Sequence, residues 1–284
     1  MVRTSTAISL VFIAAMTWSS TVGASQSNIN CGESTACVVD NGDYHIALPD
    51  AWKSNKSMPR AAIMYFHGYS GSSKNVMRNK SMMGLANRLG VALIAPNGTG
   101  RGSWAYPGSP NQSRNEFEYV KTVRMDAIKR FDLDANKLMA TGFSMGGSMV
   151  WNLACHSADD FAGFAPVAGA FWNPLPQSCD GPIPFMVHIH GTADKTVPIA
   201  GRAIGKRWRQ GDMWKSLAIL QRGEACEVQK PVPVKDGRFM CQRWNSCGSS
   251  GLIEVCLHDG GHSIRTEWIE RAWNKLVAVK GWTL

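Results

Sequence analysis

The sequence predicts an α/β fold with a mostly parallel central sheet flanked by helices. Short apolar runs bounded by Gly, Pro or Asn alternate with segments of helical periodicity, which is the pattern of repeated βαβ units. Of the 284 residues, 44% are apolar and 18% are charged, a composition that forms a packed core. No linker interrupts the pattern, so we expect one domain over residues 25–284.

The expected strands are short apolar runs, each followed by a glycine or a polar loop. They are Tyr44–Leu48, Ala61–Phe66, Val91–Ala95, Lys137–Gly142, Gly163–Val167, Phe185–His190 and Ile253–Leu257. The expected helices are Asn75–Leu89, Glu116–Phe131, Met145–His156, Trp208–Leu220 and Glu267–Leu276. Loops that follow parallel strands meet at the carboxyl edge of the sheet, where functional sites are built.

The first 24 residues have the features of a secretory signal peptide. Arg3 supplies the positive charge, Ala7–Met16 is an apolar region too short to span a bilayer, and Val22-Gly23-Ala24 is a small-residue cleavage site. We therefore expect a secreted protein, extracellular or periplasmic, that has no membrane contact after cleavage. An uncleaved membrane anchor is the alternative.

Eight cysteines in an exported chain predict four disulfides. A hairpin of Arg238–Trp244 with Leu252–His258, turning near Gly248, places Cys241 opposite Cys256. A short loop joins Cys31 to Cys37, and the remaining cysteines are assigned as a guess. The expected pairs are then Cys31–Cys37, Cys155–Cys179, Cys226–Cys247 and Cys241–Cys256. Paired CxxC knuckles are absent, so these cysteines do not predict a zinc site.

The formal net charge of +9 is scattered along the chain. The densest basic cluster, Lys206-Arg207-Trp208-Arg209, is too short for a nucleic-acid-binding arm. We therefore expect no nucleic-acid partner, and we interpret the charge as favouring solubility and attraction to anionic polymers.

The sharpest motif is Gly142-Phe143-Ser144-Met145-Gly146-Gly147, which lies between an expected strand and an expected helix. This is the G-x-S-x-G nucleophile elbow, in which a strained turn lifts the serine Oγ clear of the sheet. Small residues let the chain pass close at this turn, and the helix N-terminus adds positive partial charge beside the serine. We expect Ser144 to be the nucleophile, and a chance Gly-Ser turn is the alternative.

A second motif, His67-Gly68-Tyr69-Ser70-Gly71-Ser72, follows an earlier expected strand. An elbow needs such a partner loop, because one of its backbone N–H groups completes the oxyanion hole. We expect the N–H groups of Met145 and Tyr69 to be the two donors. His67 precedes the serine in the chain, so we expect it to be structural rather than catalytic.

The expected acid and base lie in loops after two later strands. Asp194 follows the strand Phe185–His190, and His262 follows the strand Ile253–Leu257. Asp259 is the competing carboxylate, but it lies only three residues before His262 in the same loop, a poor geometry for orienting that ring. The order Ser144, Asp194, His262 is that of the α/β-hydrolase fold. We therefore expect that fold, without a large lid domain.

Other residues near these loops are candidates for binding a metal ion or the substrate. His188 and His190 share a strand face near Asp194, which raises a metal site as a rival reading, but nothing supplies further ligands and we expect no metal. Trp104, Tyr106 and Trp172 lie in loops after strands and are candidate substrate-binding residues, with ordinary core or surface aromatics as the alternative. The segment Val197–Gln221 is the one stretch long enough to act as a cover, and we expect an open, shallow site.

The motifs occur in a characteristic order. The partner loop and the elbow are followed by Phe164-Ala165-Pro166-Val167-Ala168-Gly169, His188-Ile189-His190-Gly191-Thr192-Ala193-Asp194 and Gly260-Gly261-His262. Together they resemble the secreted feruloyl-esterase and polyhydroxybutyrate-depolymerase-like esterases, an α/β-hydrolase group that includes carbohydrate esterase family one. The resemblance runs from about residue 30 to the end of the chain. One departure is Ser263-Ile264, where members often have Trp-Pro after the histidine.

This resemblance implies a serine carboxylester hydrolase with the triad Ser144, Asp194 and His262 and with no cofactor. The implied substrate is an ester, small or polymer-linked. It carries feruloyl or acetyl groups on plant polysaccharide, or it is a hydroxyalkanoate ester of the polyhydroxybutyrate type. A peptidase on the same fold, a non-catalytic cell-envelope binding protein and a basic module that binds anionic polymers are the alternatives. The sequence leaves the oligomeric state open.

Overall fold

The computed structural model describes residues 1–2, 30–55, 57–222, 230–245 and 252–283. The expected signal peptide, apart from its first two residues, and the expected Cys226–Cys247 disulfide lie outside these ranges. Over the described ranges, no helix is both long and apolar enough to cross a membrane.

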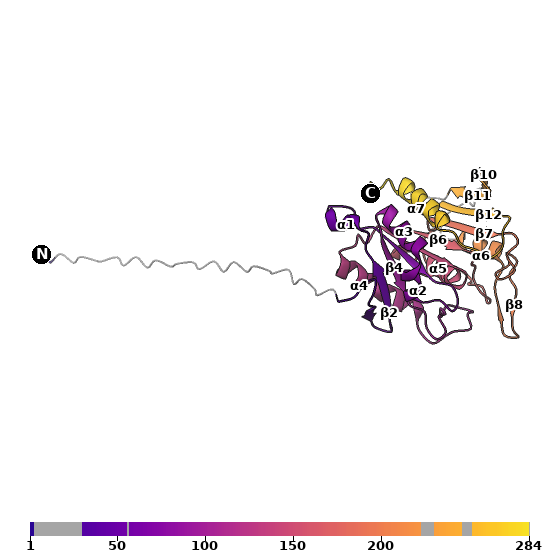
Figure 1. Cartoon of the computed structure of the whole chain (residues 1–284), viewed down its shortest axis with the longest axis horizontal. Helices are drawn as coiled ribbons and strands as arrows, with labels where there is room; N and C mark the ends of the chain where they lie inside the picture. Colours follow the sequence, from indigo (N-terminus) through magenta and orange to yellow (C-terminus); the bar gives the residue numbers. More distant parts are fainter. Residues whose placement is uncertain (3–29, 56, 223–229, 246–251, 284) are drawn as a thin grey trace.

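A ten-stranded sheet forms the centre of the molecule, with strand order β1-β2-β4-β3-β5-β6-β7-β12-β11-β10 (Figure 1). Pairing is parallel from β4 through β12 and antiparallel at both margins. The strands are β1 (Cys37–Val39), β2 (Gly42–Ala47), β3 (Ala62–Phe66), β4 (Ala92–Pro96), β5 (Leu138–Phe143), β6 (Gly163–Val167), β7 (Met186–Gly191), β10 (Val232–Asp236), β11 (Phe239–Asn245) and β12 (Leu252–His258). A separate small sheet pairs β8 (Ala203–Ile204) with β9 (Trp208–Arg209).

Helices cover both faces of the large sheet. One core contains apolar side chains of α4 (Glu116–Phe131), α5 (Met145–His156) and α6 (Met213–Leu220). The other contains those of α2 (Ser73–Arg78), α3 (Lys80–Leu89) and α7 (Thr266–Lys280). Two short elements, α1 (Ala51–Ser54) and η1 (Ala158–Asp160), complete the helices.

The strand β3 illustrates how burial on both faces of the sheet is encoded in the sequence. Met64 and Phe66 pack in the first core, whereas Ile63 and Tyr65 pack in the second. A strand that is buried on both faces reads as a continuous apolar run rather than an alternating one. The mostly parallel sheet flanked by helices is therefore confirmed.

The helix expected over Asn75–Leu89 is wrong, because the structure has two helices there. Asn79 ends α2 and begins α3, with an extended backbone at φ −78° and ψ 99°. Its side-chain carbonyl accepts hydrogen bonds from the N–H groups of Ser81 and Met82, each at 3.1 Å. An asparagine that caps a helix in this way competes with continued helical hydrogen bonding.

The helix expected over Trp208–Leu220 is also shorter than predicted. Its first residues form β9, and α6 begins at Met213. The Asp212 carboxylate caps α6 by accepting a hydrogen bond from the Lys215 N–H at 2.8 Å. The sequence reading also missed the edge strands β1 and β10.

Three of the four expected disulfides are present in the described residues. They are Cys31–Cys37, Cys155–Cys179 and Cys241–Cys256. The Cys241–Cys256 bond follows from the register of the β11–β12 hairpin, in which these two residues pair directly. The expected hairpin turn near Gly248 predicted this pairing.

Candidate active site

Ser144 lies at the turn between β5 and α5, with φ 57° and ψ −118°. This left-handed backbone is unfavourable for a residue with a side chain, and such strain is typical of functional turns. The turn is possible because its neighbours are small. A Cβ atom on Gly142 would lie 2.6 Å from the Gly146 carbonyl oxygen, and one on Gly146 would collide with the Phe66 carbonyl oxygen.

The three residues of the expected triad lie in one hydrogen-bonded line. His262 Nε2 lies 2.9 Å from Ser144 Oγ, and His262 Nδ1 lies 2.7 Å from Asp194 Oδ2. Asp194 lies in the loop after β7 and His262 in the loop after β12, and these two strands are parallel neighbours. The carboxyl edge of the sheet therefore brings together residues that are 118 positions apart.

The Asp194 side chain is fully buried beneath the partly buried His262 ring. Its second oxygen, Oδ1, accepts hydrogen bonds from the N–H groups of Thr196 and Val197, each at 2.8 Å. These bonds fix the carboxylate, and the Phe143 ring packs on the imidazole at 4.5 Å between centroids. The competing carboxylate, Asp259, makes no hydrogen bond to His262 over the described ranges.

Two backbone N–H groups beside Ser144 are available to a ligand. Tyr69 and Met145 both line the cavity that contains Ser144. Within the described part of the chain, neither N–H has a hydrogen-bond acceptor. An oxyanion hole needs such unoccupied donors, because the charge that they stabilise develops only during the reaction.

His67 holds the loop that carries Tyr69. Its Nδ1 donates to the Gly68 carbonyl at 2.9 Å, and its Nε2 accepts from the Gly98 N–H at 3.1 Å. The Trp104 indole N–H donates to the His67 carbonyl at 2.8 Å. Burial lowers the pKa of His67, which favours the neutral ring that these two bonds require. These contacts are those of a structural histidine.

His188 and His190 form a buried pair behind Asp194. His188 Nε2 lies 3.0 Å from His190 Nδ1, while their outer nitrogens bond to the carbonyls of Pro166 and Val197. Burial lowers the pKa of both rings. Each ring nitrogen lies within hydrogen-bond distance of a protein atom, and the bond to Val197 steadies the same loop that binds Asp194. In the described residues, the one cluster of metal-ligand side chains is Cys241, Glu254 and Cys256, whose cysteines are joined in a disulfide.

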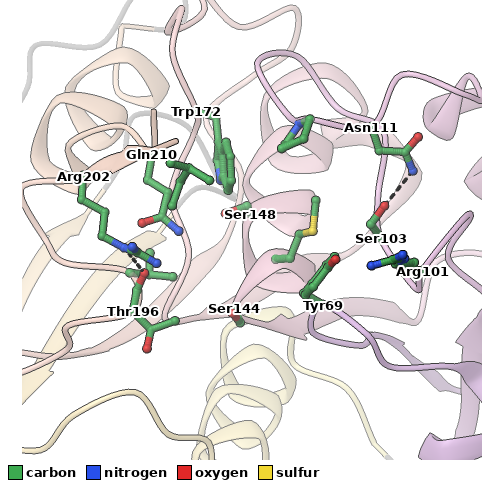
Figure 2. A pocket seen from close by; sticks show the side chains of 14 residues that line it. Tyr69, Arg101, Ser103, Asn111, Ser144, Ser148, Trp172, Thr196, Arg202 and Gln210 are labelled. Atoms are coloured by element: carbon green, nitrogen blue, oxygen red, sulfur yellow. Dashed lines mark hydrogen bonds between the residues drawn. The ribbon is translucent and has the colours of Figure 1, made fainter. Parts of the chain in front are cut away.

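A cavity of about 640 Å³ opens beside Ser144 (Figure 2). Its volume falls within the range of about 300–1,000 Å³ that is typical of small-molecule sites. Residues of the loop 101–111 form one wall, and residues of the segment 196–210 form the other. The segment expected to act as a cover therefore contributes a side wall.

Of the three aromatic residues expected to contact substrate, Trp172 lines the cavity. Trp104 and Tyr106 are 0% and 1% exposed and do not line it. Trp104 packs beneath His67, and Tyr106 supports the edge of Trp172 at 6.2 Å between ring centroids. The direct role expected for these two residues is wrong, because both belong to the core under the site.

The sequence reading missed several polar residues of the cavity. Arg101, Ser148, Arg202 and Gln210 all line it. Arg202 lies within the segment Val197–Gln221 that was expected to act as a cover, four residues before the basic cluster that begins at Lys206. Gln210 carries no motif and becomes visible only when β9 is placed against Trp172.

Together, a serine elbow after β5, a carboxylate after β7 and a histidine after β12 on a mostly parallel sheet define an α/β-hydrolase. Similar solved structures support this fold. An acetyl xylan esterase from Aspergillus awamori has a TM-score of 0.55 at 15% identity, with 82% of this chain and 94% of that chain covered. A Bacillus cereus carboxylesterase has a TM-score of 0.53 at 12% identity, with 84% and 95% covered.

Sequence similarity is more specific. Feruloyl esterase C of Emericella nidulans is 27% identical over 233 residues, which cover 79% of this chain and 77% of that protein. No family model matches the chain. The relatives and the fold support a feruloyl-esterase-like carboxylic ester hydrolase, as the motifs predicted.

Proposed function

We propose that this protein is a secreted serine carboxylester hydrolase that releases feruloyl or acetyl groups from plant polysaccharide. The observation that carries the proposal is the hydrogen-bonded line from Asp194 through His262 to Ser144 at the mouth of a cavity. The similarity to a feruloyl esterase supports the choice of ester. Three disulfides in the described residues support export, because such bonds persist in oxidising compartments.

The geometry is suited to acyl transfer in two steps. His262 Nε2 takes the Ser144 proton as Oγ attacks the ester carbonyl, and Asp194 stabilises the imidazolium that forms. The N–H groups of Tyr69 and Met145 donate to the oxyanion of the tetrahedral intermediate. The imidazolium then protonates the leaving alcohol. Water, deprotonated by the same imidazole, releases the acid and restores Ser144.

The first test compares the wild type with Ser144→Ala on nitrophenyl acetate, nitrophenyl butyrate and methyl ferulate. We expect hydrolysis by the wild type and a fall in kcat of roughly 10³-fold or more in the variant, because the nucleophile is lost. Circular dichroism checks that the variant is folded. A folded wild type that is inert on every ester, or a fully active variant, would contradict the proposal and favour a peptidase or a binding protein.

A further inference from the structure

Gln210 is a buried amide that has no hydrogen-bond partner in the described structure. Its side chain lines the cavity beside Ser144, and the residue is only 6% exposed. Its Oε1 is fully buried and unpaired, and its Nε2 makes no hydrogen bond to any described residue. Leaving a buried polar group unpaired destabilises a fold, so such a residue calls for an explanation.

The backbone around Gln210 is held firmly against the opposite strand. Gln210 forms an isolated β-bridge with Trp172, and its N–H donates to the Arg202 carbonyl at 2.9 Å. The next N–H, of Gly211, donates to the Phe171 carbonyl at 2.8 Å. The amide and the Trp172 indole are therefore fixed side by side in one wall of the cavity, as Figure 2 shows.

The surroundings of this amide favour a flat apolar ligand that carries a polar tip. Trp172, Met145, Val197 and Ile204 give the cavity its apolar lining, and Trp172 lies opposite Gln210 in the β-bridge. An acetyl group has only two carbons and bears no hydrogen-bonding group beyond its ester, so it would leave the amide without a partner. An aromatic acyl group fills more of a cavity of about 640 Å³ and brings a ring to the indole.

We infer that Gln210 binds a hydroxyl group on the ring of an aromatic acyl chain, with Trp172 contacting the ring itself. Oε1 is covered by protein in this orientation, but a 180° flip of the amide exchanges the oxygen and the nitrogen. A hydroxyl both donates and accepts, so it pairs with whichever of the two atoms faces the cavity. This inference rests on the proposed esterase function and names the residue that selects the acyl group. It makes Gln210 a specificity-determining residue rather than part of the hydrolytic machinery.

The test measures kcat/KM for methyl 4-hydroxycinnamate and for methyl cinnamate, which differ only in the ring hydroxyl. We expect the wild type to prefer the hydroxylated ester by about 10-fold or more, because the unhydroxylated ring leaves the buried amide unpaired. In Gln210→Leu and Gln210→Met, that ratio is expected to fall to near one. Most of the change should appear in KM for the hydroxylated ester.

Gln221→Leu is the matched control. Gln221 is also a buried glutamine, and its amide nitrogen has no partner among the described residues, but it does not line the cavity. We expect this variant to keep the wild-type ratio. A wild-type ratio near one would overturn the inference without any variant, and so would an unchanged ratio in folded Gln210→Leu.

The two proposals fail in different ways. If Ser144-dependent hydrolysis of nitrophenyl acetate is absent, the esterase function itself fails. If that hydrolysis is present but the ring hydroxyl has no effect, only the role of Gln210 fails. A preference that follows a hydroxyl of the alcohol group instead of the acyl group would also contradict the inference.

Discussion

The two oxygens of the Asp194 carboxylate have different partners. Oδ2 faces His262 Nδ1 at 2.7 Å, whereas Oδ1 accepts from the N–H groups of Thr196 and Val197. The backbone of its own loop thus fixes the carboxylate independently of its hydrogen bond to the imidazole. It requires the proton of the neutral ring to lie on Nδ1, which leaves Nε2 free to accept the Ser144 proton.

Asp194→Asn is expected to lower kcat by about 10⁴-fold while leaving the fold intact, because an amide permits the wrong histidine tautomer. The measurement is steady-state hydrolysis of methyl ferulate. Asp259→Asn is the control, since Asp259 is the carboxylate nearest to His262 in sequence, and it should keep near-wild-type kcat. A large loss in Asp259→Asn with little loss in Asp194→Asn would reverse the assignment of the acid.

Single residues were predictable from sequence where the chemistry demands a motif. Ser144, Asp194 and His262 were predicted from glycine-rich motifs and from their positions after expected strands. The structure brings the three side chains within hydrogen-bond distance. Trp104 and Gln210 were not predictable in this way. Whether a loop aromatic faces a cavity or the core depends on packing between distant segments, and a glutamine without a motif carries no local signal.

At the scale of elements, long apolar segments were easier to predict than their boundaries. The strands that are buried on both faces appear as continuous apolar runs, and β3 and β6 lie where the runs predicted. The break at Asn79 and the start of α6 depend on single capping side chains within otherwise helical patterns. The edge strand β10 is largely exposed, so it has no apolar run that would predict it.

The strand β12 carries a buried acid that joins three elements. Glu254 has a fully buried side chain that is paired with Arg243 of β11 at 2.7 Å and with Arg271 and Lys275 of α7 at 2.7 and 2.6 Å. The cluster ties the antiparallel margin of the sheet to the last helix. Removing Glu254 leaves the partly buried Arg243 and Lys275 without a counter-charge among the described residues, whereas Arg271 keeps its ion pair with Asp236.

Glu254→Ala is expected to reduce the free energy of unfolding by roughly 3–5 kcal/mol. Urea denaturation followed by circular dichroism measures the change. Glu118→Ala removes an exposed glutamate of α4 and should change stability by less than about 1 kcal/mol. Equal effects of the two substitutions would show that the cluster does not stabilise the fold.

At the scale of the whole molecule, the net charge of +9 has a local counterpart at the cavity. Arg101 lies in one wall and Arg202 in the other, and neither forms an ion pair over the described ranges. Lys206, Arg207 and Arg209 continue the basic surface along the β8–β9 hairpin. The rim of the site is therefore positive on both sides.

We expect this charge to favour substrates attached to uronate-bearing polysaccharide. Raising the ionic strength from about 0.01 to about 0.15 M shortens the Debye length from about 30 to about 8 Å, so KM on such a polymer should rise several-fold. KM for neutral methyl ferulate, measured in the same buffers, should change little. Equal salt dependence for both substrates would argue that the rim does not attract the polymer.

The pairing of β7 with β12 has a consequence for how such an enzyme changes over evolutionary time. These neighbours hold the proposed acid and base, Asp194 and His262, at one edge, although the chain between them includes the wall with Arg202 and Gln210. Insertions, deletions and substitutions in that excursion alter what the enzyme selects while its ends stay anchored in the sheet. Chemistry and selectivity thus reside in separable portions of one chain, so new substrate preferences are able to arise without rebuilding the reaction.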